Sequence, residues 1–393
     1  MKKDDVSAAV PTYTQLPSLP SDDVEGHWHQ VVRRRAFLKV GAGVAAATIP
    51  AGTLLATNAM AAGNTLTKGD AAILRFLAAA ELIETDLWQQ YNELGGVDGG
   101  NKAYIAALQN LDGDMPQYIT DNTDDEISHA AFLNAYLKSR GAEPVNLDKF
   151  RTLPSSKATG AKQTGRLTNL QKLVVDTSWY TRYRSKENPD FGATFGQAVQ
   201  INNEPAIPLN DTDTPPTQPQ PAPPTTDPQR RMQAIASTAG FHFGYIEQGG
   251  SSLYTALSLK ASDLEVLRII VSIGGVEVDH FSLWHDKAGN AVSGSLANLT
   301  DPITGVTFPD LNDTKRFPAE QFQTNKILPE PSDFIRKGLP ECSVIRPTAI
   351  ENAGAVATIK SFTADLLFVG QSPEFFQTVM QLARAADAAR REL

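Results

Sequence analysis

Two Glu-x-x-His motifs are the residues of this chain best placed to do chemistry. One pairs Glu126 with His129, and the other pairs Glu277 with His280. In a helix, residues three apart lie on one face, about one turn from each other. A carboxylate and an imidazole in that position can bind the same metal ion. The motifs therefore predict metal ligands on two helices.

A lone glutamate precedes each motif, Glu81 before the first and Glu247 before the second. Each has an aromatic residue seven positions later, Trp88 and Tyr254 respectively. Seven residues are close to two helical turns, so each aromatic lies on the stripe of its glutamate. The repeated order indicates an internal duplication of a two-helix unit. A four-helix bundle that buries two Glu-x-x-His pairs and two more glutamates holds two metal ions.

Four helices must position these residues. A glycine pair ends the first helix, and Pro228 stands at the favoured first position of the third. The spacing of apolar residues predicts helices over about 70–94, 124–139 with a start as early as 116, 227–259 and 262–286. Paired glycines lie beside Glu247 and Glu277 inside the last two helices. Each glycine costs about 1 kcal/mol against alanine there, so either the helices approach closely or bulge, or they break.

Two of the glutamates have other interpretations. Glu84 lies one turn after Glu81 and is either a rival ligand or an exposed charge; the spacing to the aromatics favours Glu81. Thr123-x-x-Glu126 is a capping-box pattern, which would make Glu126 a helix cap. A cap would not explain His129 on the same face.

The rest of the chain is irregular, with 25 prolines in 393 residues. The segment 141–227 is an oversized crossover between the second and third helices, with a candidate helix over Asn169–Arg184 whose aromatics we expect to pack on the bundle. From 211 to 227 it is rich in Pro and Thr, which predicts an extended or disordered chain. The extension 291–393 is loop-rich and ends in an amphipathic helix that begins with Ser372-Pro373. That helix fits the outside of the bundle or an oligomer contact.

Composition excludes several classes of function. The net charge of −9 argues against nucleic acid or an anionic membrane as a partner. The single cysteine, Cys342, allows no internal disulfide and no thiolate cluster. A fused rubredoxin-type electron donor is therefore excluded.

The N-terminus reads as an export signal. Arg34-Arg35-Ala36-Phe37-Leu38-Lys39 resembles the twin-arginine signal, a short apolar run follows, and Ala59-Met60-Ala61 fits a cleavage site. We therefore expect residues 1–61 to be removed after recognition by the twin-arginine export machinery, which would leave an exported or periplasmic protein without a stable membrane span. A membrane anchor or a fortuitous basic cluster is the other interpretation.

The complete motif set resembles the ferritin-like di-iron carboxylate superfamily. Ala80–Trp88 and Glu126–Leu133 are more narrowly similar to exported ferritin-like proteins that include plant desiccation-related proteins. The resemblance implies an all-α, ferritin-like four-helix bundle within residues 62–290. It implies two metal ions bridged by Glu126 and Glu277. The ligands it implies are Glu81, Glu126, His129, Glu247, Glu277 and His280.

Two iron ions are the superfamily's usual choice; manganese is the alternative, and the ligand types also admit zinc. The expected chemistry is ferrous oxidation or peroxide detoxification, with peroxide disproportionation for a manganese centre. The competing hypothesis is a stress-associated structural or binding protein whose metal site is non-catalytic or absent. A homo-oligomer is compatible with either.

Overall fold

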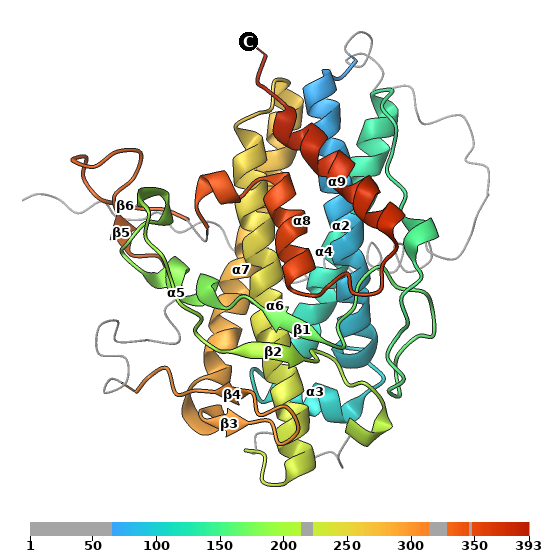
Figure 1. Cartoon of the computed structure of the whole chain (residues 1–393), viewed down its shortest axis with the longest axis vertical. Helices are drawn as coiled ribbons and strands as arrows, with labels where there is room; N and C mark the ends of the chain where they lie inside the picture. The colour runs from blue at the N-terminus through green and yellow to red at the C-terminus, as the bar shows by residue number, and fades with distance from the viewer. Residues whose placement is uncertain (1–64, 214–222, 314–327, 346–347, 393) are drawn as a thin grey trace, which may run out of the picture. The chain divides into compact units, whose positions relative to one another are not determined.

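The structure is a computed structural model, and it describes residues 65–213, 223–313, 328–345 and 348–392. The expected export signal, residues 1–61, and most of the Pro-rich end of the crossover lie outside the described residues. Four long helices form the core of the described part (Figure 1). They are α2 (Lys68–Gly95), α4 (Met115–Ser139), α6 (Asp227–Ser258) and α7 (Leu264–Ala291).

The helices pair as α2 with α4 and α6 with α7, which are the two most extensive contacts between elements. The short α3 (Lys102–Gln109) lies between α2 and α4 in the chain, and a tight loop joins α6 to α7. Side chains cap the helix starts: Thr67 accepts from the Asp70 amide, and Asp263 accepts from the Glu265 amide. The expected all-α bundle is confirmed.

Two local interpretations are wrong. Helix α4 begins at Met115, with Pro116 in its first turn, so Glu126 is an interior residue and does not cap the helix. Helices α6 and α7 run unbroken through their paired glycines. A Cβ on Gly274 would lie 2.7 Å from Tyr254 Cβ. Close helix approach, and not a break, is thus the reason for glycine at that position.

The crossover contains less helix than expected. Of the predicted helix Asn169–Arg184, only α5 (Ser178–Arg184) is helical. Residues Leu173–Val175 form β1, which pairs antiparallel with β2 (Ile201–Glu204), because β-branched residues in a short run favour a strand. The aromatic residues pack on the bundle as predicted, and Trp179 lies against Phe241 of α6 and Phe281 of α7. The 3-10 helices η1 (Asp148–Phe150), η2 (Pro189–Phe191) and η3 (Asp211–Asp213) complete the described crossover.

The C-terminal extension covers the bundle with two helices. The predicted terminal helix is α9 (Pro373–Ala388), which packs against α2 and buries Phe375 and Val379. Helix α8 (Ala355–Ala364), which we did not predict, contacts α9 and α6. The shorter elements are η4 (Gly294–Leu296), β3 (Leu299–Thr300), β4 (Thr307–Phe308), β5 (Pro331–Ser332), β6 (Cys342–Ser343) and η5 (Ile350–Asn352). None of the described helices combines the length and apolar character that crossing a membrane requires.

Candidate metal centre

The six predicted ligands converge in the middle of the bundle. Glu81 comes from α2, Glu126 and His129 from α4, Glu247 from α6, and Glu277 and His280 from α7. Their relative exposure ranges from 0% to 7%, so all six are buried. Their ligand atoms form two groups of four, within 4.8 Å in each group, and the groups share Glu126 and Glu277. Two adjacent binding positions with two common carboxylates are the arrangement that a dinuclear centre needs.

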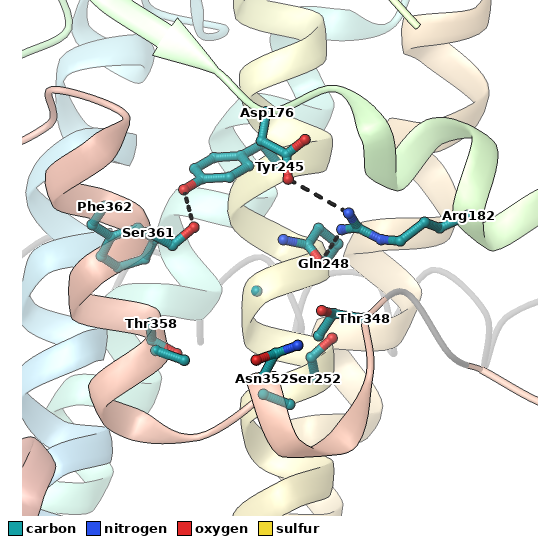
Figure 2. A pocket seen from close by; sticks show the side chains of 13 residues that line it. Asp176, Arg182, Tyr245, Gln248, Ser252, Thr348, Asn352, Thr358, Ser361 and Phe362 are labelled. Atoms are coloured by element: carbon teal, nitrogen blue, oxygen red, sulfur yellow. Dashed lines mark hydrogen bonds and ion pairs between the residues drawn. The ribbon is translucent and has the colours of Figure 1, made fainter. Parts of the chain in front are cut away.

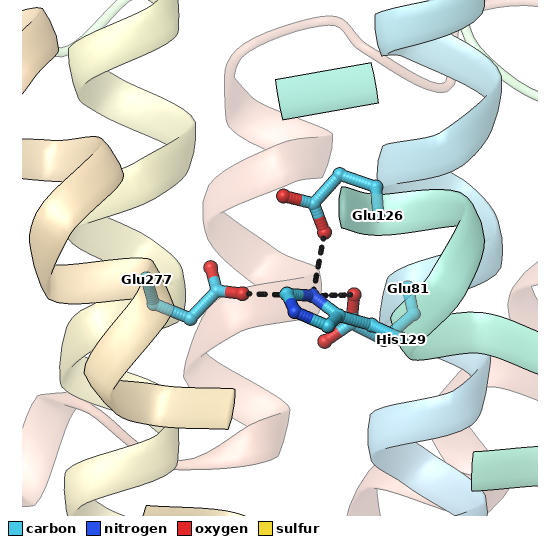
Figure 3. A group of neighbouring side chains, drawn as sticks. All are labelled: Glu81, Glu126, His129 and Glu277. Atoms are coloured by element: carbon cyan, nitrogen blue, oxygen red, sulfur yellow. Dashed lines mark hydrogen bonds and ion pairs between the residues drawn. The ribbon is translucent and has the colours of Figure 1, made fainter. Parts of the chain in front are cut away.

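The first group surrounds His129 (Figure 3). Its Nδ1 lies 3.3 Å from Glu81 Oε2, 3.3 Å from Glu126 Oε2 and 3.5 Å from Glu277 Oε1. Ligand atoms that sit about 2.1 Å from one ion lie about 3 Å from each other, so these separations are suited to a single cation.

The second group surrounds His280. Its Nδ1 lies 3.3 Å from Glu126 Oε1 and 3.3 Å from Glu247 Oε2. Glu126 therefore directs one oxygen to each histidine, which is the geometry of a bridging carboxylate. Glu277 completes this group as it does the first.

Several atoms of the two groups have no hydrogen-bond partner although they are buried. They are Glu81 Oε2, Glu247 Oε2, Glu277 Oε1 and Oε2, and His280 Nδ1. An unpaired polar atom in a dry interior is costly, and an unpaired charge is much more so. Bound cations remove that cost. The donor set, oxygen and imidazole nitrogen without sulfur, suits iron, manganese or zinc.

Comparison with known proteins agrees with this geometry. The ferritin-like domain family matches residues 69–290, which is more than half of the chain. The chain belongs to the ferritin-like domain family. No curated protein and no solved structure matches it.

Protons stabilise the ferritin-like centre when it holds no metal. Burial, with the nearby charge of Glu126, raises the pKa of Glu81 to about 8. Burial and the same neighbour raise the pKa of Glu277 well above its ordinary value, and burial also raises the pKa of Glu247. These carboxyls therefore bind protons more tightly than carboxyls in water.

Among the remaining ligands, the pKa of Glu126 is lowered, and the pKa values of the two histidines are raised. Burial alone would raise the pKa of Glu126, but the neighbouring imidazoles of His129 and His280 lower it below its ordinary value. Burial alone would lower the pKa of His129, but the neighbouring carboxylates of Glu126 and Glu81 raise it to about 10. The pKa of His280 is likewise raised, chiefly by the charge of Glu247 acting against burial. A metal entering the site must displace these protons.

A second layer of side chains holds the ligands in place. Asn122 Nδ2 donates to Glu126 Oε1 at 2.9 Å and to Glu247 Oε1 at 3.0 Å. Trp284 Nε1 donates to Asn122 Oδ1 at 2.6 Å, which fixes the amide. No motif in the sequence marks Asn122, although it stands four residues before Glu126 on the same helix face. Such partners orient ligands and tune the metal.

Two further partners distinguish the halves of the centre. The Tyr254 hydroxyl donates to Glu81 Oε1, so the aromatic predicted to share a stripe with Glu247 supports the ligand on the opposite helix pair. His280 Nε2 lies 3.1 Å from Asp125 Oδ2, which keeps Nδ1 free for the centre. Asp125 immediately precedes Glu126, whereas Val276 precedes Glu277. The duplication therefore supplies a carboxylate partner for only one of the two histidines.

Glu84, which the sequence left as either a rival ligand or an exposed charge, lies in the interior. It is 4% exposed, so it is a buried residue and not an exposed charge. Burial and the neighbouring Glu81 raise its pKa well above the ordinary value. Glu84 belongs to neither of the two groups that could hold an ion. The structure therefore brings together the preferred six residues and leaves this rival beside them.

The other two bundle histidines, His242 and His285, belong to neither group of ligands. His285 stacks on Tyr180 with ring centroids 4.6 Å apart, and burial lowers its pKa to about 3. A neutral ring in an aromatic cluster is structural. His242 lies 2.7 Å from the Tyr91 hydroxyl and 3.2 Å from Asp365 Oδ2.

Proposed function

We propose that this ferritin-like protein binds a dinuclear centre, preferably of two iron ions, and uses it for redox chemistry with dioxygen or peroxide. The observation that most supports this proposal is the position of Glu126, whose two carboxylate oxygens face two different histidines. Other buried carboxylate oxygens beside it have no hydrogen-bond partner. Glu126 and Glu277 would bridge the metals. Glu81 with His129 would complete one site, and Glu247 with His280 the other.

The chain's own residues would prepare this reaction in three ways. Four buried carboxylates offset the charge of two divalent cations and favour their oxidised state. Asn122 and Trp284 hold the ligands in a fixed geometry, so little reorganisation accompanies a change in charge. The apolar residues around the centre exclude bulk water. The centre, when bound, supplies electrons to dioxygen or peroxide.

Ferrous oxidation and peroxide detoxification are the reactions that this chain suits. Its single cysteine provides no built-in electron donor, so any reductive turnover needs an outside reductant. Peroxide disproportionation, which a manganese centre would perform, needs none.

The proposed site of action is outside the cytoplasm. Arg34-Arg35 and the cleavage-like Ala59-Met60-Ala61 support export by the twin-arginine route, and the segments Ala80–Trp88 and Glu126–Leu133 support a desiccation-related type of protein. Replacing Arg34 and Arg35 together by lysine should keep the precursor in the cytoplasm. Cell fractionation measures this, and a processed, exported double variant would contradict the export proposal.

One experiment separates redox function from a structural role. Metal-free protein is loaded anaerobically with Fe(II) or Mn(II), its metal content is determined, and consumption of dioxygen and peroxide is followed. We expect two metals per chain and consumption faster than that of free metal. Two metals without consumption would support a structural site, and failure to bind metal would overturn the proposal. Protein purified from its native compartment would identify the native metal.

A further inference from the structure

A buried tyrosine, histidine and aspartate form a hydrogen-bonded row outside the metal centre. The Tyr91 hydroxyl lies 2.7 Å from His242 Nδ1, and His242 Nε2 lies 3.2 Å from Asp365 Oδ2. Tyr91 and His242 are fully buried, and Asp365 is 2% exposed. With Nε2–H donated to the carboxylate, Nδ1 accepts the phenolic proton. The row joins α2, α6 and the end of α8.

The row is connected to the proposed metal ligands through aromatic rings. Tyr91 lies one turn from Trp88 on α2, with ring centroids 5.7 Å apart. Trp88 stacks on Trp284 of α7 at 5.4 Å, and Trp284 donates to Asn122. Asn122 in turn donates to Glu126 and Glu247. Van der Waals and hydrogen-bond contacts are therefore continuous from Tyr91 to the centre.

The other end of the row meets a pocket of about 270 Å³. Asp365, Tyr245 and Ser361 line it, together with Gln197 and Asn202 from the crossover. A smaller adjoining pocket shares Tyr245 and Ser361, and Figure 2 shows the Tyr245 hydroxyl bonded to Ser361 there. Asp365 Oδ1 has no hydrogen-bond partner although it is buried. A small molecule can thus approach one end of the row while the centre stays enclosed at the other.

We propose that Tyr91 is a one-electron relay between the metal centre and this pocket, with His242 as the base that accepts its phenolic proton. This inference rests on the proposed redox function. The oxidant is the centre after its reaction with dioxygen or peroxide. The reductant is a small one-electron or hydrogen-atom donor, such as a phenol or an enediol, whose hydroxyl groups match the amides, hydroxyls and carboxylate of the pocket.

The relay step balances in atoms and electrons. Metal ions held by the six ligands would accept one electron from Tyr91 through Trp88 and Trp284, and the Tyr91 O–H bond would break as its proton passes to His242 Nδ1. The products are a neutral phenoxyl radical and an imidazolium, which Asp365 stabilises. A donor in the pocket then returns one electron, and the proton moves back from His242 to the Tyr91 oxygen. The donor leaves as a neutral radical, oxidised by one electron, after its own hydroxyl proton passes to the solvent at the pocket.

The geometry favours Tyr91 over two other buried tyrosines, Tyr104 and Tyr245. Burial raises the pKa of Tyr91 well above 10, so the phenol does not ionise before oxidation and must lose its proton to a partner. Tyr104 is equally buried, but its hydroxyl donates to the Ala206 carbonyl at 2.7 Å, which is not a base. The Tyr245 hydroxyl lies 2.7 Å from Ser361, another weak base. Only Tyr91, of these three, has an imidazole at its oxygen.

The test oxidises the metal-free protein from the pocket side. Asn202, an exposed pocket residue, is replaced by cysteine in a Cys342→Ser background, and a ruthenium polypyridyl photo-oxidant is attached to the introduced thiol. Transient absorption after a laser flash then detects tyrosyl radical. We expect a long-lived tyrosyl signal that falls at least tenfold in Tyr91→Phe and in His242→Phe. Tyr245→Phe is the matched control, because Tyr245 lines the pocket but its hydroxyl bonds Ser361 and not an imidazole, and we expect it to keep the signal.

The outcomes separate the relay from the proposed function. A signal unchanged in Tyr91→Phe, or abolished in Tyr245→Phe, would overturn the relay whatever the metal chemistry proves to be. Protein that binds no metal, or consumes neither oxidant, would overturn the proposed function, and the flash experiment would still measure proton-coupled oxidation of Tyr91.

A second experiment uses the metal-loaded protein. Iron-loaded protein mixed with peroxide and frozen should show a tyrosyl radical by electron paramagnetic resonance. The radical should be present in Tyr104→Phe and absent in Tyr91→Phe. Melting temperatures of the variants establish that each one folds.

Discussion

Gly250 lies directly against the carboxylate of Glu277. A Cβ at position 250 would come within 2.2 Å of Glu277 Oε2, so glycine here leaves room for a proposed bridging ligand. The Gly250→Ala variant should force Glu277 away from the metals. We expect the metal content after anaerobic Fe(II) loading to fall from two per chain to one or less, with the helical circular dichroism unchanged.

Gly249 provides the control for that substitution. A Cβ on Gly249 would meet nothing within 4 Å, and the residue belongs to the same helix. Gly249→Ala should therefore retain both metals and stabilise the metal-free protein by up to about 1 kcal/mol, the usual gain in a helix interior. Equal metal content in the two variants would mean that Glu277 does not need this space.

Bridging and terminal ligands should differ in what their loss removes. Glu126 and Glu277 belong to both groups, whereas Glu81 and Glu247 each belong to one. Glu126→Gln or Glu277→Gln should therefore release both metals, and Glu81→Gln or Glu247→Gln should leave about one per chain, as elemental analysis would show. Asp279→Asn, which removes an exposed charge from α7, is the control and should keep two. A bridging variant that still binds two metals would disprove the bridging assignment.

The ligand set was predictable because helical spacing converts sequence separation into position. Each histidine stands three positions after its glutamate, so the motif alone places both on one face. The partner of a ligand on another helix has no such signal. Tyr254 was grouped with Glu247 by spacing, yet its hydroxyl reaches Glu81 across the bundle. Likewise no spacing in the sequence links Asp125 of α4 to His280 of α7, and only the folded bundle brings the two side chains together.

The crossover was predicted least well. Leu173–Val175 reads as part of a helix by its apolar residues, because a short apolar run does not distinguish helix from strand. The segment forms a strand because it pairs with Ile201–Glu204, about 30 residues away in sequence. That pairing is a tertiary contact, which the local sequence does not show. The sequence left the environment of Glu84 open for a related reason. Its burial depends on which helices cover that side of α2.

The stability of the metal-free protein should fall as the pH rises. Folding raises the pKa of Glu81 from 4.5 to about 8 and that of His129 from 6.5 to about 10. The folded state then binds more protons than the unfolded state from about pH 5 to pH 10, so the free energy of unfolding decreases across this window. We expect a loss on the order of a few kcal/mol, measured by urea unfolding at pH 6 and pH 9. Metal-free protein that is more stable at pH 9 would contradict the proton-filled centre.

Metal should reverse that trend, because cations replace the protons. The gain in melting temperature on metal binding should be larger at pH 8 than at pH 6, since protons compete for the same ligands at the lower pH. Loading in weak buffer should release protons, which a pH indicator dye detects. Glu277→Gln should release fewer protons, and an equal release from this variant would place the metal elsewhere.

Asp125 should control only the half of the centre that contains His280. Its carboxylate lies 3.1 Å from His280 Nε2 and is half exposed, so it orients the ring and raises the basicity of Nδ1. Asp125→Asn should weaken the binding of one of the two metals about 10- to 100-fold. The binding of the other metal should be unchanged, because His129 belongs to the other group. Stepwise titration with Fe(II) or Mn(II) under anaerobic conditions resolves the two affinities.

Asp124→Asn, at the exposed neighbouring position, is the matched control for Asp125→Asn. Equal weakening of both metals by Asp125→Asn would mean that the two halves do not bind independently, and no weakening would mean that packing alone orients His280.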